Sequence, residues 1–306
     1  MFAASIFLGL SLVASTLKSI VGKKVSIATN TVNDVSFFHG VRMVICVVIG
    51  AALVLIFDGP KGFIIDWKTL IVAAITGFGF ALNIMMWAFS QRKGAYVISD
   101  VMIVVSSIIP ILLSYVFYQE SISVVDIIGY LVVIGGCFLI VTYNNQINKK
   151  ITFALIAIYI VYIIATGVSD FGRKVFQVDS ASGASLVSAN GFTFYSVLFS
   201  LLTFAIFYAF TFKKESVKYQ KSIFWKEFIY VAIAAVMTYA YSYLLIPASI
   251  IPTTILFLVK NGGGLIINVI VAAFLFKEKP TPRLFIGIGI TIAAIVMIGL
   301  FWQKYF

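Results

Sequence analysis

Ten long, mostly apolar runs constrain this chain more than any other feature of its sequence. The hydrocarbon core of a bilayer is about 30 Å thick, and a helix needs about 20 residues to cross it. These runs are continuously apolar, whereas the strands of a membrane barrel are shorter and alternate apolar with polar residues. We therefore expect an all-α integral membrane protein with ten transmembrane helices. The expected spans are 2–22, 36–57, 69–91, 95–118, 123–142, 152–172, 184–212, 228–246, 250–276 and 283–302.

The composition leaves little material for a soluble domain. Hydrophobic residues make up 62% of the 306 positions and charged residues 11%, against about half and about a quarter in soluble proteins. The longest polar connection, from Lys213 to Glu227, is too short to fold alone. Cys46 and Cys137 both lie inside apolar runs, so the sequence predicts neither a disulfide framework nor a cysteine-based metal site.

Motifs that indicate catalysis are missing from the sequence. It contains no HExxH, GxSxG or P-loop, and its single histidine, His39, cannot build a histidine-rich metal centre. We expect no enzyme activity, no cofactor and no metal. The net charge of +11 arises mostly between the apolar runs, which is typical of contact with lipid headgroups rather than nucleic acid. The expected partners are a small-molecule substrate and the lipid bilayer, bound by a monomer or homodimer.

An internal repeat relates the first expected helix to the sixth. Residues 22–25 (GKKV) match residues 172–175 (GRKV), 150 positions later. Two further pairs agree in the same register, Thr16 with Thr166 and Ser19 with Ser169. A second match, with an offset of 158, pairs Glu120 with Glu278 in the turns before the fifth and tenth helices. Two matches in the same order indicate a repeat of five helices.

Five helices per repeat have a geometric consequence. An odd number of crossings leaves the chain on the opposite side of the membrane, so the second repeat must be inverted relative to the first. We expect residues 1–146 and 147–306 to form two inverted five-helix repeats within one transmembrane domain. Inverted repeats are typical of transporters, because two such halves can expose a central site first to one side and then to the other.

The sequence resembles a known family. The turn 117–120 (FYQE) and its counterpart 275–278 (LFKE) each precede a glycine in an apolar helix, Gly129 and Gly287. These segments look like the closing signature of each half in the drug/metabolite transporter superfamily, particularly its EamA-like bacterial branch. Arg42, early in the second helix, is also similar to a recurrent feature of that branch. The resemblance covers the whole chain and implies a multi-pass protein of the bacterial cytoplasmic membrane.

A second resemblance concerns the ninth expected helix. Its tract 260–264 (KNGGG) is similar to the lysine-bearing helix of nucleotide-sugar and phosphate-ester carriers in the same superfamily. The fourth expected helix departs from that pattern, because it carries Asp100 and no lysine. The glycines of the tract also allow another helix to approach closely.

Charged residues inside the membrane are costly and are therefore candidates for function. Lys260 lies deepest, about 15 Å from the expected start of its helix, at a rise of about 1.5 Å per residue. Arg42 lies about 9 Å and Asp100 about 7 to 8 Å inside their helices. We expect Lys260 and Arg42 to bind substrate, and Asp100 to couple protons or to serve as a counter-charge. Lys18 lies about 6 Å from the expected end of its helix, where its ammonium group can reach the interface. Asp170 is shallower still in its helix.

Uncharged residues complete the expected site. Asn83 and Trp87 are four positions apart and share one face of the third helix, and Tyr239 and Tyr243 do the same in the eighth. These two helices hold equivalent places in the two repeats, so the four side chains are expected to line a cavity between them. Two asparagines are further candidates for substrate binding, Asn190 and Asn261.

Together these features favour a secondary transporter that moves a small polar metabolite, such as an amino acid, by alternating access. An alternative is a carrier of an anionic sugar-phosphate or nucleotide-linked substrate. A lipid flippase is a further alternative, because the same helices would serve if the cavity opened sideways to lipid. No selectivity filter or ring of pore charges indicates a channel.

The distribution of charge predicts the orientation of the chain. The connections after the first, third, fifth, seventh and ninth helices hold 14 Lys and Arg residues, and the opposite side holds 5. The basic side is expected to be cytoplasmic. On intact cells, an impermeant thiol reagent should therefore label Phe306→Cys and leave Ser222→Cys unmodified, each tested in a cysteine-free background. Labelling of Ser222→Cys with protection of Phe306→Cys would reverse the orientation.

Overall fold

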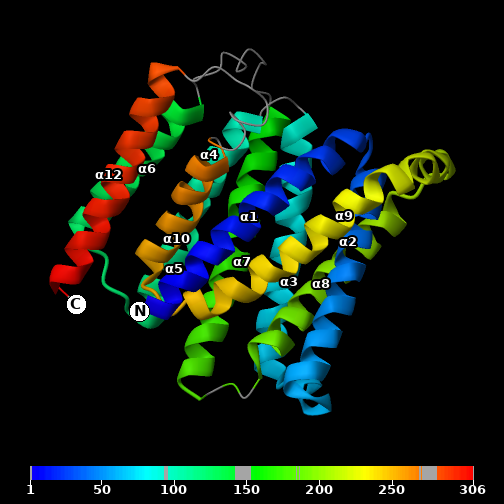
Figure 1. Ribbon diagram of the computed structural model, residues 1–306, viewed down its shortest axis with the longest axis horizontal. Helices are drawn as coiled ribbons and strands as arrows, with labels where there is room; N and C mark the ends of the chain where they lie inside the picture. Colours follow the sequence, from blue (N-terminus) through cyan, green and yellow to red (C-terminus); the bar gives the residue numbers. More distant parts are fainter. Residues whose placement is uncertain are drawn as a thin grey trace.

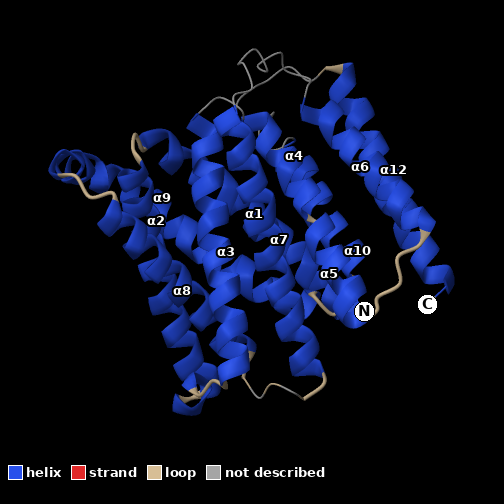
Figure 2. Ribbon diagram, turned by 180° about the vertical axis from the view of Figure 1, so that it is seen from behind, coloured by secondary structure: helices blue, strands red, loops and turns tan. Residues whose placement is uncertain are grey.

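The chain folds into a bundle of helices. The structure, a computed structural model, describes residues 2–92, 96–141, 153–183, 185, 187–268, 270 and 281–305, and these contain no strand. Figures 1 and 2 show helices crossing the bundle alternately in opposite directions, with both chain ends at the same end of the molecule. In chain order the elements are α1 (Phe2–Ala28), α2 (Val32–Leu53), η1 (Val54–Asp58), η2 (Pro60–Phe63), α3 (Trp67–Arg92), α4 (Tyr96–Ser106), α5 (Ile108–Tyr118), α6 (Val124–Val141), α7 (Phe153–Ala181), α8 (Ala189–Phe210), α9 (Lys214–Ala248), α10 (Thr253–Leu258), η3 (Val259–Gly263) and α12 (Pro282–Tyr305).

The all-helical fold predicted from the sequence is confirmed. Seven helical segments of the described chain are long and apolar enough to cross a membrane, and they lie in α1, α2 with η1, α3, α4 with α5, α7, α8 and α9. Helices α6 and α12 contribute shorter apolar segments, Val124–Ile140 and Pro282–Ile298. The span expected at 250–276 begins with α10 and η3, and its last part, 271–276, lies outside the described residues. The count of ten transmembrane helices stays a prediction.

Three helices extend further than their apolar runs predict. Helix α1 continues to Ala28 and α7 to Ala181, beyond the expected ends at 22 and 172. The connection expected from Lys213 to Glu227 is also wrong, because this segment forms the first turns of α9. Polar side chains hold it in place, and the Tyr219 hydroxyl donates to the carbonyl of Ala28 at 2.7 Å. A hydropathy pattern predicts that a helix ends where polar residues begin. The helix itself continues where those residues find hydrogen-bond partners.

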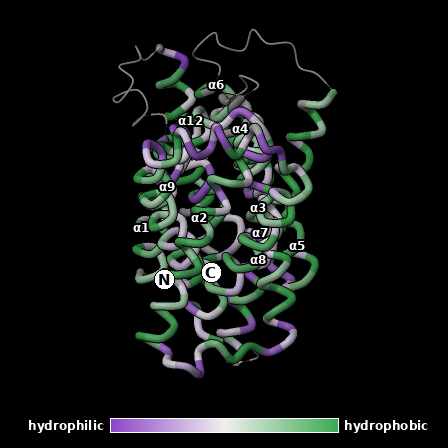
Figure 3. Tube along the Cα trace, turned by 90° about the vertical axis from the view of Figure 1, so that its right-hand side faces the viewer, coloured by the Kyte–Doolittle hydropathy of each residue, from purple (hydrophilic) through white to green (hydrophobic). Residues whose placement is uncertain are grey.

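The helices pack in pairs around two apolar cores. Helix α1 packs on α9, α3 on α7, α2 on α8, and α6 on α12. One core lies mainly among α1, α2, α3, α8 and α9, and the other mainly among α4, α5, α6, α10 and α12. Figure 3 shows hydrophobic residues predominating along the helices. Large apolar side chains also face outward, with Phe57 71% and Phe210 86% exposed, as expected of a surface that contacts lipid tails.

The signature glycines of the repeat lie where α6 meets α12. A Cβ atom at Gly287 would lie 2.8 Å from the carbonyl oxygen of Gly136, and one at Gly129 would lie 2.7 Å from Ile298 Cγ1. Small residues let two backbones approach closely, which improves the van der Waals packing that helps to drive helix association in membranes. The close approach explains why glycine is needed at these two positions.

Replacing Gly287 should therefore destabilise the protein. Gly287→Ala places a methyl group against the backbone of α6, and overpacking of this kind costs about 1–3 kcal/mol. Gly289→Ala is the matched control two residues along the same helix, because nothing lies within 4 Å of its Cβ position. Thermal unfolding in detergent should show a lower transition temperature for Gly287→Ala only. Equal transition temperatures for the two variants would contradict the close contact of α6 with α12.

Candidate functional site

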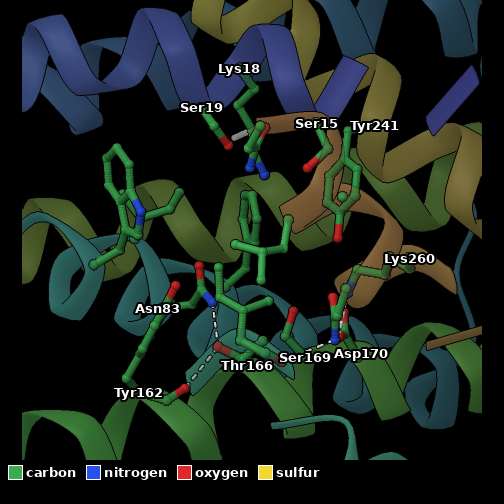
Figure 4. Close-up of a pocket in the computed structure, with 18 of the residues that line it drawn as sticks. Ser15, Lys18, Ser19, Asn83, Tyr162, Thr166, Ser169, Asp170, Tyr241 and Lys260 are labelled. Carbon is green, nitrogen blue, oxygen red and sulfur yellow. Dashed lines mark hydrogen bonds and ion pairs between the residues drawn. The ribbon is translucent and has the colours of Figure 1, made fainter. Parts of the chain in front are cut away.

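A cavity of about 100 Å³ lies in the middle of the bundle, between α1, α3, α7, α9 and η3 (Figure 4). Five of the residues predicted to bind substrate line it: Arg42, Asn83, Trp87, Lys260 and Asn261. They come from both halves of the chain. Polar side chains of α1 and α7 complete the wall, as Figure 4 shows for Lys18, Ser19, Thr166 and Asp170.

Two interrupted helices meet at one side of the cavity. The span expected at 95–118 breaks at Ser107 into α4 and α5, and the span from Thr253 passes through the π-helical turn η3. The amide of Asn261 in η3 donates to the carbonyl of Ile103 at 3.1 Å and to Ser107 Oγ at 2.6 Å. Ile103 is the residue that the offset of 158 pairs with Asn261. Interruptions at corresponding places in two halves are typical of transporter binding sites.

One carboxylate organises the charged side chains of the cavity. Asp170 Oδ2 pairs with the ammonium of Lys260, and Asp170 Oδ1 lies 3.3 Å from Nη1 of Arg173. All three residues are buried, and the exposed fraction is 2% for Asp170 and 8% for Lys260. Arg173 Nη1 also donates to Ser169 Oγ at 3.0 Å. The pair of Lys260 with Asp170 therefore joins η3 to α7 at one side of the cavity.

Two more cations line the cavity without a carboxylate partner among the described residues. The ammonium of Lys18 lies 4.1 Å from the centre of the Tyr241 ring and 5.8 Å from that of Phe80. The buried Arg42 donates from Nε to Thr238 Oγ1 at 2.7 Å. The prediction that Lys18 reaches the interface is therefore wrong. Because α1 continues to Ala28, Lys18 lies about 15 Å from its end.

The other side of the cavity is polar but uncharged. The Asn83 amide donates to Thr166 Oγ1, which in turn donates to the Tyr162 carbonyl at 2.7 Å. Asn83 and Trp87 are half-buried, in contrast with the buried Asp170 and Arg173. The side chains of Asn83 and Trp87 are therefore more exposed than the Asp170 and Arg173 pair.

Three residues predicted to bind substrate lie away from the cavity. Tyr239 is buried in the apolar core against Gly50, and Tyr243 packs against the same core. Tyr241 lines the cavity instead, because residues two apart lie on nearly opposite faces of a helix. Asn190 donates to Asp58 Oδ2 at 3.1 Å, which is a structural contact between the start of α8 and the end of η1. Asp100 lies in α4, but its side chain is outside the described part of the chain.

The sequence held one signal for the residues that we missed. Arg173 belongs to the repeated tract 172–175, and Asp170 follows the matched residue Ser169. Thr166 and Ser169 of the same register line the cavity, as does Ser19. The register of the repeat therefore marks the cavity face of α7. The expected end of this helix at 172 concealed the signal, because it placed Asp170 at the membrane surface. In the structure Asp170 lies about 16 Å from the end of α7.

A second ion pair lies just beyond the charged end of the cavity. Lys174 Nζ lies 2.8 Å from Glu120 Oε1 and donates to the carbonyls of Ser249 at 3.0 Å and Ile251 at 3.2 Å. The other oxygen of Glu120 accepts from the backbone N–H of Thr253 at 2.9 Å. These contacts, which we term the Lys174 latch, tie α7 to the turn after α5 and to the connection between α9 and α10. Glu278, the repeat counterpart of Glu120, lies outside the described residues.

Comparisons with known proteins agree with the fold. The EamA-like transporter family matches residues 2–142, which confirms the resemblance predicted from the sequence. A crystal structure described only as that of a protein superposes with a TM-score of 0.72, covers 100% of this chain and 99% of its own, and is 11% identical. At this identity the likeness shows the fold alone. Among curated proteins none matches significantly. The family match over residues 2–142 and the long apolar helices support a multi-pass membrane protein.

The shared carboxylate predicts unequal effects of two substitutions on stability. Lys260→Gln leaves Asp170 paired with Arg173, whereas Asp170→Asn leaves two buried cations without their counter-charge. Removing one partner of a buried pair costs about 3–5 kcal/mol, so Asp170→Asn should unfold at a lower temperature than Lys260→Gln. Thermal unfolding of the ligand-free proteins in detergent measures the difference. A larger loss for Lys260→Gln would mean that Arg173 does not share the carboxylate.

Proposed function

We propose that this chain, whose residues 2–142 match the EamA-like transporter family, is a secondary transporter that moves a small polar metabolite across the membrane by alternating access. The observation that carries the proposal is the cavity in the middle of the bundle, lined by polar and charged side chains from both halves of the chain. Buried charges are costly in a membrane protein and mark transport pathways. The family is one of transporters, so we expect no catalysis by this chain.

The packing of the helices supports two inverted repeats, residues 1–146 and 147–306. In the proposed repeat α1 corresponds to α7 and α9 to α3, and α1 packs on α9 as α7 packs on α3. The contact between Asn261 and Ile103 joins positions that the offset of 158 makes equivalent. Such a contact is expected where two related halves meet at their symmetry axis.

The Lys174 latch supports alternating access. It lies one residue beyond Arg173 and joins three parts of the chain at the end of the bundle that holds both termini. The half-buried residues of the cavity lie toward the opposite end, near Trp87. We propose that this conformation is closed at the latch and receives substrate from the other side, which the charge distribution makes cytoplasmic. The bacterial cytoplasmic membrane is the proposed location.

The size of the cavity favours a small metabolite over the alternatives. An engineered cavity of about 150 Å³ holds one benzene molecule, so a site of about 100 Å³ accepts a ligand of similar or smaller size. A nucleotide-linked sugar is several times larger. A lipid headgroup with its chains would also need a lateral opening. The cavity as it stands favours an amino acid or a metabolite of comparable size.

Transport can be tested in liposomes that contain the purified protein. A thermal-shift screen of small metabolites identifies ligands, because binding to the folded state raises the transition temperature. Each ligand is then tested for saturable uptake and for counterflow. Counterflow of a small metabolite would support a carrier. Uptake without saturation or counterflow would indicate a channel, and movement of labelled lipid between leaflets would indicate a flippase.

Filling the cavity should abolish this transport. Gly264 lines the cavity, and its Cβ position meets only Leu12 Cδ2 at 3.6 Å, so Gly264→Trp adds an indole at the cavity wall and reduces the space for substrate. Uptake should fall at least tenfold while the protein remains folded. Gly9→Trp is the control, since Gly9 is exposed on the outer face of α1 with nothing within 4 Å. Normal uptake by folded Gly264→Trp would place the pathway elsewhere.

A further inference from the structure

We infer that the transported metabolite is a small organic anion bearing a carboxylate, and that Asp170 occupies the anion site in the empty carrier. This inference rests on the proposed transport function and adds the chemical class of its substrate. Its basis is the balance of charge in the cavity and the arrangement of the cations around one aromatic ring.

Positive charge exceeds negative charge among the described residues of the cavity. Four cationic side chains line it, Lys18, Arg42, Arg173 and Lys260, and Asp170 is the carboxylate that the described lining contains. Arg42, Arg173 and Lys260 are buried. A buried cation without a counter-charge is costly in the membrane. A bound anion offsets that cost, whereas a cationic substrate increases it.

Three of the cations converge on Tyr241. The ring centre lies 4.1 Å from Lys18 Nζ, 5.8 Å from Lys260 Nζ and 5.8 Å from Arg173 Cζ. Figure 4 shows Lys18 on one side of the cavity and Lys260 with Asp170 on the other. These side chains come from α1, η3 and α7. The three cations therefore surround a space that both halves of the transporter define.

Asp170 indicates which anion suits this space. Its two oxygens are divided between Lys260 and Arg173, which is the way a carboxylate uses both oxygens with two charged donors. A substrate carboxylate would find the same donors, and Lys18 faces it from across the cavity. The substrate and Asp170 therefore compete for Lys260 and Arg173, and two carboxylates close together also repel each other.

The uncharged end of the cavity limits the rest of the substrate. Asn83 and Trp87 offer an amide and an indole to a polar or flat group. With a total of about 100 Å³, the cavity fits a carboxylate with a short body and excludes a long acyl chain. Phosphate monoesters present a related oxyanion, so the experiment must separate them from carboxylates.

The test measures binding of defined probes to the purified, full-length protein by calorimetry and thermal shift. The probes are L-lactate, succinate, the neutral lactamide and glucose 6-phosphate. We expect the two carboxylates to bind and lactamide to bind at least tenfold more weakly. Preference for glucose 6-phosphate over both carboxylates would overturn the assignment to a carboxylate. Equal binding of L-lactate and lactamide would overturn the anion site itself.

Three variants test the competition between substrate and Asp170. Asp170→Asn removes the internal competitor and should raise the affinity for L-lactate at least tenfold, with a correspondingly larger thermal shift. Lys18→Gln should lower it at least tenfold, and this variant breaks no described ion pair. Lys24→Gln is the matched control on α1, because the exposed Lys24 lies 4.7 Å from the Tyr230 ring, outside the cavity. Unchanged binding by Lys18→Gln, or weaker binding by folded Asp170→Asn, would refute the inference.

Counterflow separates failure of this inference from failure of the transport function. Counterflow of a neutral metabolite that is insensitive to Lys18→Gln and Asp170→Asn would retain the carrier and overturn the anion site. Carboxylate binding with the expected response to these variants, but without counterflow of any carboxylate that binds, would retain the anion site and overturn the transport function.

Discussion

The ion pairs of Asp170 with Lys260 and Arg173 hold together the parts of this bundle that apolar packing cannot specify. Lipid tails are as apolar as the helix surfaces, so hydrophobic burial alone gives membrane helices little preference for one partner over another. A buried carboxylate shared by two cations permits few other arrangements of the helices, because each cation would otherwise be buried without a counter-charge, at a large cost in free energy. The pair of Lys260 with Asp170 fixes η3 against α7, and the π-helical turn of η3 is the local distortion that accompanies the contact.

Much of the fold could be predicted because membrane helices have a simple sequence pattern. Continuous apolar runs marked the helical segments, and an ammonium group as deep as that of Lys260 had to lie near other polar groups. The cavity indeed contains Lys260 with Arg42, Asn83, Trp87 and Asn261. Depth within a helix was the informative quantity for these residues. It depends on the position in the sequence and needs no knowledge of which helices are neighbours.

The rest depended on contacts that a linear reading does not contain. The ends of α1 and α7 were placed too early because polar residues that face a cavity resemble those that face water, and this error moved Lys18 and Asp170 to the surface. The face of α9 was also misjudged. Tyr239 and Tyr243 share a face, but whether that face meets the cavity or the apolar core depends on how α9 rotates against α1, and Tyr241 is the tyrosine that meets the cavity. The ion pair between Lys260 and Asp170 joins residues 90 positions apart.

Arg173 and Lys174 are consecutive residues of α7, one in the cavity and the other in the latch. Successive side chains leave a helix about 100° apart, because 3.6 residues complete a turn. Over so short a distance an α-helix behaves as a stiff rod, and a small rotation of α7 moves both side chains together. A displacement of Arg173 would therefore also displace Lys174, because no residue lies between them. In a working carrier this adjacency would couple the cavity to the Lys174 latch, so that the contacts of Arg173 determine when the latch breaks and opening without substrate is suppressed.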